Sequence, residues 1–304
     1  MEFVLGHNLL LVLGFAVLPS VLGVLILLPM HETPKFLLCF RHDRPAAIRS
    51  IRFYHGRDAN CEEVLEAVVK ESEQETHSQS SYWELLTTPH LRKGVLLGIT
   101  ALQQTTALWV IFFQSIFFLE QVDIDAHWAG WASTAMVFFY TIGSALGSSF
   151  VDRWGRRNLL LPFAAASLCL LLLFVVCAVL HPIAPFANYG CVASLWLYTF
   201  IYGFGCGPIC WYLVAELAPQ MHRSRVQVVC YFTNMVISGA IMFALMPLFK
   251  LVGYSAFLPL YVLPGFVSLA VLYAKLPETR GREIHEIVAE LKGTKNGDLL
   301  KESS

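Results

Sequence analysis

The sequence predicts an all-α integral membrane protein with about seven transmembrane spans and a cytoplasmic helical linker. Hydrophobic residues make up 56% of the 304 residues, charged residues only 14%, and the mean hydropathy is +0.59. Soluble domains contain about 25% charged residues, so much of the charged surface of a soluble protein is absent. The lengths of the apolar runs and the sorting of charges between them support the same fold class.

Seven apolar runs are long enough to cross a bilayer as helices, because about 20 residues span the roughly 30 Å hydrocarbon core. The first run does not read as a signal peptide, since it starts with Glu2 rather than a basic residue and lacks a small-residue cleavage site before Met30. The predicted spans lie near residues 3–29, 95–119, 128–151, 158–180, 187–215, 227–249 and 254–276.

Lysine and arginine residues are sorted to one side of these spans. If the spans alternate in direction, 20 of the 21 Lys and Arg residues lie on one face, and Lys250 is the exception. Cytoplasmic loops carry an excess of Lys and Arg, so this face is predicted to be cytosolic. We expect the protein in the plasma membrane, with its C-terminus in the cytosol. The basic face consists of the segments 30–94, 152–157, 216–226 and 275–304.

The spans divide the chain into four predicted parts. These are a single span (1–30), a cytoplasmic helical linker (31–94), a six-helix transmembrane domain (95–276) and a cytoplasmic tail (277–304). Within the linker, helices are predicted over Pro45–Tyr54 and Asn60–Lys70, with Asn60 as an N-cap. The linker is either a solvated connection or a small bundle of cytoplasmic helices.

Composition also argues against several classes of function. No basic stripe with interleaved aromatic residues lies in a soluble segment, so nucleic-acid binding is not expected. Most of the eight cysteines lie in apolar spans and predict no disulfide framework. Cys206 and Cys210 share a helical face but lack His or carboxylate co-ligands, so we expect no metal and no cofactor. No Ser-His-Asp set or carboxylate pair lies at membrane depth, and an enzyme is not predicted.

A repeat links the ends of the first and last spans. Glu32-Thr33 is followed by a basic residue after span one, and Glu278-Thr279 is followed by Arg280 after span seven. Many transporters are built from repeated halves. Spans two to seven are then one complete repeat, and span one is the last helix of a preceding repeat that the sequence does not contain.

Five motifs resemble those of the sugar-porter branch of the major facilitator superfamily, and they extend over nearly the whole chain. The first is the loop Asp152-Arg153-Trp154-Gly155-Arg156-Arg157, which occurs twice in such proteins and once here. The others are Glu32-Thr33-Pro34-Lys35, Gln103-Gln104, Gly207-Pro208-Ile209-Cys210-Trp211 and Pro277-Glu278-Thr279-Arg280-Gly281-Arg282. This resemblance implies a C-terminal six-helix bundle of that superfamily, plus one extra transmembrane helix.

The resemblance implies a sugar or polyol substrate that contacts Gln103, Gln104, Trp211 and Asn234. Amides both donate and accept hydrogen bonds, as sugar hydroxyls do. Interhelical hydrogen bonding is the alternative role for the amide side chains, and ordinary packing is the alternative for Trp211. Gly207 and Pro208 are expected to weaken the helix where a gate bends.

The resemblance also implies a salt-bridge network at the inner membrane face, which closes the inner gate. Arginine–carboxylate pairs suit this role, since they are bidentate and can exchange partners. Simple anchoring by positive charge is the alternative. The expected members are Asp152, Arg153, Arg156, Arg157, Glu216, Arg223, Glu278 and Arg280.

Several positions depart from the hexose-transporter pattern. Where such transporters place asparagine or acidic residues, this chain has Trp109, Tyr140, Gly203 and Ser238. Each lost hydrogen bond removes about 0.5–1.5 kcal/mol of net stabilisation. A less hydroxylated or more aromatic-preferring substrate fits this lining as well as glucose does.

The predicted mechanism is alternating access, with a site at the bilayer midplane between two six-helix bundles. We expect the 304-residue chain to transport nothing alone and to need a complementary N-terminal half. The alternative is a non-transporting half-transporter that assembles with, or regulates, a full-length sugar porter. A seven-helix receptor is a third possibility, and it predicts an extracellular N-terminus.

Overall fold

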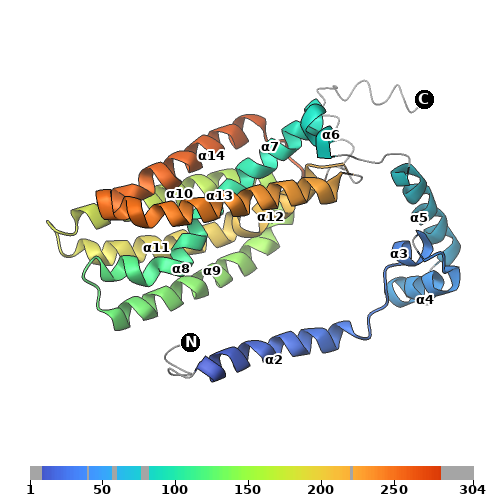
Figure 1. Ribbon diagram of the computed structural model, residues 1–304, viewed down its shortest axis with the longest axis horizontal. Coiled ribbons are helices and arrows are strands. Elements are labelled where there is room, and N and C mark those ends of the chain that lie inside the picture. The colour runs from blue at the N-terminus through green and yellow to red at the C-terminus, as the bar shows by residue number, and fades with distance from the viewer. Residues whose placement is uncertain (1–8, 40, 57–59, 77–81, 220–221, 282–304) are drawn as a thin grey trace. The chain divides into compact units, whose positions relative to one another are not determined.

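A computed structural model describes residues 9–39, 41–56, 60–76, 82–219 and 222–281 (Figure 1). The chain divides into two compact units, residues 1–79 and 80–304. All the regular structure in the described residues is helical, as the sequence predicts. The sequence-based linker ended at residue 94, whereas the second compact unit begins at residue 80.

The first unit holds a long apolar helix and three shorter amphipathic ones. Helix α2 (Leu9–Leu27) is followed by α3 (Pro34–Cys39), α4 (Arg44–His55) and α5 (Cys61–Thr76). The predicted first span begins in residues outside those described, and the apolar part of α2 recognised among the described residues, Val17–Leu27, is shorter than a span.

Helices α3, α4 and α5 pack around a small apolar core. Leu37, Ala47, Ile51 and Leu65 are buried together. Asp43 caps α4, because its carboxylate accepts a hydrogen bond from the backbone N–H of Ala46 at 2.9 Å. The linker therefore contains a helical bundle, which was one of the two interpretations open from the sequence.

The second unit contains six membrane-length helical segments among the described residues. Several are built from two consecutive helices with an irregular residue or turn between them. The helices are α6 (Tyr82–Thr87), α7 (Pro89–Gln103), α8 (Thr106–Glu120), α9 (Ala126–Trp154), α10 (Arg156–Leu180), α11 (Ala187–Gly205), α12 (Gly207–Glu216), α13 (Arg223–Val252) and α14 (Leu263–Lys275), with a 3₁₀ turn (Gly253–Ala256) and a π turn (Leu258–Val262) before α14.

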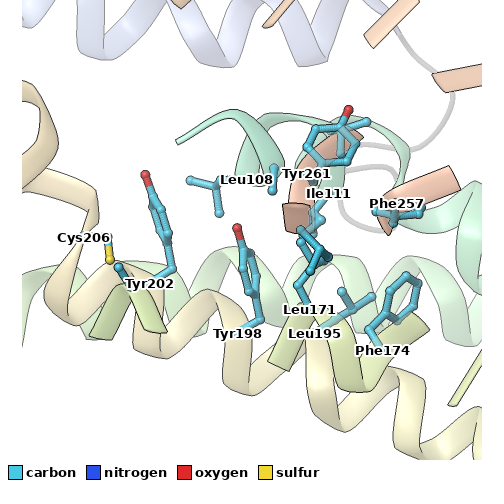
Figure 2. Packing of buried hydrophobic residues seen from close by; sticks show 14 of the residues in the cluster. Leu108, Ile111, Leu171, Phe174, Leu195, Tyr198, Tyr202, Cys206, Phe257 and Tyr261 are labelled. Atoms are coloured by element: carbon cyan, nitrogen blue, oxygen red, sulfur yellow. The ribbon is translucent and has the colours of Figure 1, made fainter. Parts of the chain in front are cut away.

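The membrane-length segments lie side by side along one direction (Figure 1). Helix α11 packs against both α9 and α10, while α7 packs against α12, α13 and α14. The core between them is strongly aromatic: Tyr198 and Tyr202 of α11 are almost fully buried, and Phe174 of α10 packs edge-on to Phe257 (Figure 2).

Glycines allow α9 and α11 to approach very closely. A Cβ at Gly147 would lie 2.0 Å from the carbonyl oxygen of Phe204, and one at Gly203 would lie 2.6 Å from that of Tyr140. Backbone atoms cannot move aside as a flexible side chain can. The glycine at position 203, one of the departures noted from the sequence, is therefore required by helix packing in this chain.

Candidate functional site

The first site region lies in mid-bundle, where a membrane-length segment is broken. Helix α7 ends at Gln103 and α8 begins at Thr106, so Gln104 and Thr105 form a turn inside the segment Pro89–Glu120. The backbone N–H of Thr105 donates to the carbonyl of Leu102, three residues earlier, at 2.9 Å. This is the spacing of a 3₁₀ turn, whereas an α-helix bonds residues four apart. The sequence predicted one continuous span here.

Asn234 of α13 supports this break. Its Nδ2 donates to the carbonyl oxygen of Leu102 at 3.0 Å, and the Thr105 hydroxyl donates to the same oxygen at 2.7 Å. The backbone N–H of Thr105 donates to this carbonyl as well, so Asn234, the sole asparagine of its span, adds a donor from another helix and ties α13 to the broken helix.

Gln104 is directed at α14 on another side of the break. Its Nε2 donates to the carbonyl oxygen of Gly265 at 2.9 Å and to the hydroxyl of Ser268. Both amide hydrogens are therefore used within the bundle. In this conformation interhelical bonding accounts for Gln104, and its side chain is almost completely buried.

Gln103 differs from its neighbour. It is half-buried and makes no side-chain hydrogen bond within the described residues. The two glutamines line a cavity of about 10 Å³, which holds one water molecule at most. The amide hydrogens of Gln104 are thus committed to α14, whereas the amide of Gln103 has no such bond within the described residues.

Buried polar atoms without a partner occur on α8, which begins at the break, and on α13, which contacts it through Asn234. Apart from Arg223 Nε at the start of α13, they number four among the described residues of these two helices. Unpaired buried polar atoms are uncommon and often mark a place where a ligand or water binds. They are Thr106 Oγ1, Gln114 Oε1, Asn234 Oδ1 and Ser238 Oγ. Sequence reasoning did not single out Thr106 or Gln114, although a Thr and a Gln within an apolar run were visible signals.

Trp211 is linked to this region through α13. It is half-buried on α12, and its ring packs 5.4 Å from that of Tyr231, centroid to centroid. The Tyr231 hydroxyl donates to the carbonyl of Trp211 at 2.7 Å. Tyr231 precedes Asn234 by one helical turn, so α13 connects the tryptophan to the broken helix.

The helix that carries Trp211 is also interrupted. Helix α11 ends at Gly205 and α12 begins at Gly207, with Cys206 between them and Pro208 at the second position of α12. A proline is tolerated at this position because the first N–H groups of a helix have no intrahelical acceptor. The break coincides with the predicted bend at Gly207 and Pro208.

The second site region lies at the end of the bundle that the sequence assigns to the cytosol. Arg156, the first residue of α10, places its Nε and Nη2 each 3.3 Å from Oε1 of Glu216. The other carboxylate oxygen of Glu216 accepts a hydrogen bond from the Thr279 hydroxyl at 2.6 Å. Both charged side chains are about one-fifth to one-quarter exposed, at 20% and 26%.

Glu278 closes the same cluster from the segment after α14. Its Oε1 accepts hydrogen bonds from the backbone N–H of Arg156 at 3.0 Å and of Arg280 at 3.1 Å. The carboxylate therefore caps the positive N-terminus of α10. Gly155 makes room for it: its φ is +88°, and a Cβ there would lie 2.9 Å from Oε2 of Glu278.

The other residues predicted for the salt-bridge network make fewer contacts with charged partners. Arg157 donates to the carbonyl oxygen of Tyr273 at 2.8 Å rather than to a carboxylate, because consecutive helical residues point in different directions. Arg223 makes no ion pair in the described residues, and its Nε is buried without a partner. Arg153 is exposed. The backbone of Asp152 lies in α9, and its side chain falls outside the described residues.

Comparison with known proteins identifies the family. The family model described as "Sugar (and other) transporter" matches residues 6–291. The chain belongs to this family. Among its relatives are the facilitated glucose transporter member 2 of pig (Sus scrofa), 25% identical over 95% of this chain, and member 4 of cattle (Bos taurus), 28% identical over 92% of it. These alignments cover 56% and 55% of the relatives, so the chain spans about half their length.

Solved structures show the fold of this sugar transporter family member. The proton:xylose symporter XylE, bound to 6-bromo-6-deoxy-D-glucose, superposes with a TM-score of 0.70 at 17% identity. The match covers 90% of this chain and 57% of XylE. A double-tryptophan variant of XylE gives a TM-score of 0.71 at 15% identity. The predicted all-α fold of the major facilitator type is confirmed.

Proposed function

We propose that this chain supplies one of the two bundles of a sugar transporter that works by alternating access. The observation that carries the proposal is the set of unpartnered buried polar atoms on α8 and α13, of which Thr106 Oγ1 and Asn234 Oδ1 belong to residues at the helix break. Hydroxyl groups of a sugar both donate and accept, so they suit amide and hydroxyl side chains that lack partners. Membership of the sugar transporter family supports the same substrate class.

Within this site we assign contact with the sugar to Gln103 and Asn234, with Trp211 as an apolar surface beside them. Asn234 has a free carbonyl oxygen and Gln103 a free amide. Gln104 holds α7 against α14 in the present conformation and can reach a sugar only if those bonds exchange. Gly207 and Pro208 are assigned to the bend at the interrupted helix.

The cluster around Arg156 and Glu216 is assigned to the inner gate. It joins the start of α10, the end of α12 and the segment after α14, which are distant in sequence. Two donors of Arg156 share a single oxygen of Glu216, and the partial exposure of the pair keeps the energy of exchanging partners low. Movement of any one of the three segments separates the groups.

Labelled hexose uptake tests the proposal. The 304-residue chain, reconstituted alone in liposomes, is expected to give uptake no greater than empty liposomes, because one bundle provides one wall of the pathway. Co-expression with the half of a glucose transporter that this chain does not cover is expected to give uptake. Gln103→Leu should abolish that uptake, while the matched variant Gln121→Leu, just beyond the far end of α8, should not.

Robust uptake by the chain alone would overturn the two-bundle mechanism, and uptake that survives Gln103→Leu would overturn the site. Co-purification with an intact porter, without uptake by the pair, would favour a regulatory half-transporter instead.

We further propose that the protein lies in the plasma membrane and that the end of the bundle bearing Arg156 faces the cytosol. The positive-inside distribution supports this orientation. Single cysteines introduced at Arg153 and at Lys250, in a cysteine-free background, should be labelled by an impermeant maleimide from opposite sides of sealed vesicles. Labelling of residue 153 from outside intact cells would contradict the orientation.

A further inference from the structure

Helix α4 of the first unit carries arginine on the side that faces away from its core. Ala47 and Ile51 are buried against α3 and α5. With about 3.6 residues per helical turn, Arg49 and Arg52 point away from that core, and both are exposed. The helix contains no acidic residue. Its outer side is therefore positively charged, whereas the first turn of the neighbouring α5 is acidic.

The arginines of α4 differ in their partners. Arg44 forms an ion pair with Glu62 of α5, with its Nη2 atom 2.5 Å from Oε2. The side chains of Arg49 and Arg52 make no ion pair and no hydrogen bond within the described residues. Two guanidinium groups about one turn apart thus have no counter-charge in the part of the chain that the structure describes.

Helix α4 is also attached to the chain just after α2, which is the predicted first span. The hydroxyl of Ser50 donates to the carbonyl of Glu32, and the hydroxyl of Tyr54 donates to the carbonyl of His31. The imidazole of His31 stacks on the ring of Phe53, with the ring centroids 4.7 Å apart. These three contacts hold one side of α4 against the residues that follow the span.

The attachment lies close to the end of α2. That helix ends at Leu27, four residues before His31. Four residues reach about 14 Å at most, and they reach less here because the backbone N–H of Met30 donates back to the carbonyl of Leu27. Unpaired charges act over about 8 Å at physiological ionic strength. A span that ends near Leu27 therefore places Arg49 and Arg52 within reach of lipid headgroups.

Phe53 adds an apolar contact beside the two arginines. It is 52% exposed, although His31 stacks on its ring. It follows Arg52 directly and lies four residues after Arg49, so it borders the same side of the helix. Helices that lie at a bilayer interface combine aromatic residues, which enter the headgroup boundary, with basic residues, which attract anionic lipids.

We propose that this side of α4 binds the anionic glycerophospholipids of the cytoplasmic leaflet. The guanidinium groups of Arg49 and Arg52 bind the headgroups, and Phe53 enters the headgroup boundary, so the linker bundle is held at the membrane surface. Basic segments immediately cytoplasmic of a span are attracted to anionic lipids. The inference does not depend on sugar transport. It rests on α2 as a span, and on the proposed orientation only for which leaflet supplies the lipid.

Charge and position favour a lipid surface over the other partners that arginine residues bind. A soluble phosphate would pair with Arg49 and Arg52 but would leave the exposed ring of Phe53 in water. An acidic protein segment would pair with the arginines as well, but it would have to displace the bilayer surface that the end of α2 brings next to them. The lipid headgroups satisfy both the charge and the location.

Photocrosslinking of the full 304-residue chain in lipid nanodiscs tests the proposal. Benzoylphenylalanine replaces Phe53, and the nanodiscs contain phosphatidylcholine and phosphatidylserine with the same acyl chains. Mass spectrometry gives the ratio of the two lipids among the adducts, which is divided by their ratio in the nanodisc. We expect phosphatidylserine to be enriched about fivefold. The same probe at Val69, which is exposed on the acidic α5, should show no enrichment.

Charge variants that carry the probe at Phe53 identify the groups responsible. Arg49→Gln and Arg52→Gln should each lower the enrichment, and the double variant should remove it. Arg44→Gln is the matched control, since it removes the same charge from the same helix but from a guanidinium that is paired with Glu62. It should leave the enrichment unchanged. Added salt should lower the enrichment in the parent chain. Circular dichroism and thermal unfolding of each variant should match the parent, because the substituted side chains are exposed.

The proposal is overturned if the double variant keeps the enrichment of the Arg44→Gln control. It is also overturned if the probe at Phe53 forms no lipid adduct, or forms adducts in the proportions of the bilayer. Loss of the enrichment on adding glycerol 3-phosphate would identify a soluble-anion site, and crosslinking to a peptide would identify a protein partner. Either result overturns the proposal. An error in the orientation alone does not affect this test, because both leaflets of the nanodisc have the same composition.

Discussion

The mid-bundle site and the inner-end cluster both hold together helices that are distant in sequence, but they do so with different chemistry. At mid-bundle, neutral amides join helices: Gln104 bonds α14, and Asn234 bonds the broken end of α7. At the inner end, charged groups do so: Arg156 pairs with Glu216, and Glu278 caps α10. Burial explains the difference, because an ion at membrane depth carries a desolvation penalty that an amide avoids.

The side chains of the two regions also differ in how many of their hydrogen-bonding groups have partners. Glu216 uses both carboxylate oxygens, and Gln104 uses both amide hydrogens. Asn234 keeps one free acceptor. Side chains whose hydrogen-bonding groups are used within the bundle stabilise the fold, whereas free ones can bind a ligand. Four substitutions test this distinction, and each is expected to have a smaller effect on stability than the one before it.

Gly155→Ala is expected to have the largest effect. The φ of +88° belongs to a region that essentially only glycine adopts, and the new Cβ would also displace the Glu278 carboxylate. Together these should lower the free energy of unfolding in detergent by about 3 kcal/mol. Gly253→Ala is the matched control, since its φ is also positive, at +61°, but nothing lies within 4 Å of its Cβ. Equal losses in the two variants would show that Glu278 does not stabilise the helix end.

Gln104→Leu is expected to have the second-largest effect. It should lower the free energy of unfolding by about 1–2 kcal/mol, because two buried hydrogen bonds are lost. Asn234→Leu is the comparison within the same region. It removes one bond to the Leu102 carbonyl, which keeps Thr105 as a donor, and it also removes an unpartnered oxygen. Its stability loss should therefore be about half as large. In the co-expression experiment Asn234→Leu should nevertheless reduce hexose uptake more per unit of lost stability than Gln104→Leu does.

The opposite ranking of uptake would assign sugar contact to Gln104 and a structural role to Asn234. The measurement that separates the two is uptake normalised to folded protein. Thermal unfolding of both variants supplies the stability scale.

Glu216→Gln should lower the free energy of unfolding by about 0.5–1 kcal/mol, because partly exposed ion pairs contribute little. The amide retains an acceptor for the Thr279 hydroxyl, so the loss reports mainly the charge. Salt screens this contribution, whereas the hydrogen bonds of Gln104 are neutral. The effect of Glu216→Gln should therefore shrink between 0.05 and about 1 M salt, and the effect of Gln104→Leu should not. An effect of Glu216→Gln that is independent of salt would contradict the ionic interpretation.

The sequence predicted the fold well, since apolar runs and sorted charges are strong signals of membrane spans. Its predicted partners for individual side chains were less accurate. Arg156 and Arg157 are adjacent in one motif, yet helical geometry turns one to Glu216 and the other to a backbone carbonyl. The turn at Gln104 and Thr105 lies inside an apolar run, and hydropathy does not report backbone hydrogen bonding. The packing role of Gly203 depends on a helix more than 50 residues away in sequence.

Arg153→Gln is expected to have the smallest effect, within about 0.3 kcal/mol of the parent chain. Its side chain is exposed, and it has no described partner. Arg157→Gln is the internal comparison: it removes the bond to the Tyr273 carbonyl and should lower stability by about 0.5–1 kcal/mol. The two substitutions remove the same charge on either side of Gly155, so any shared effect measures anchoring by positive charge, and the difference measures the bond. Equal losses from both would mean that charge at this membrane face, rather than side-chain pairing, holds the inner ends of the helices in place.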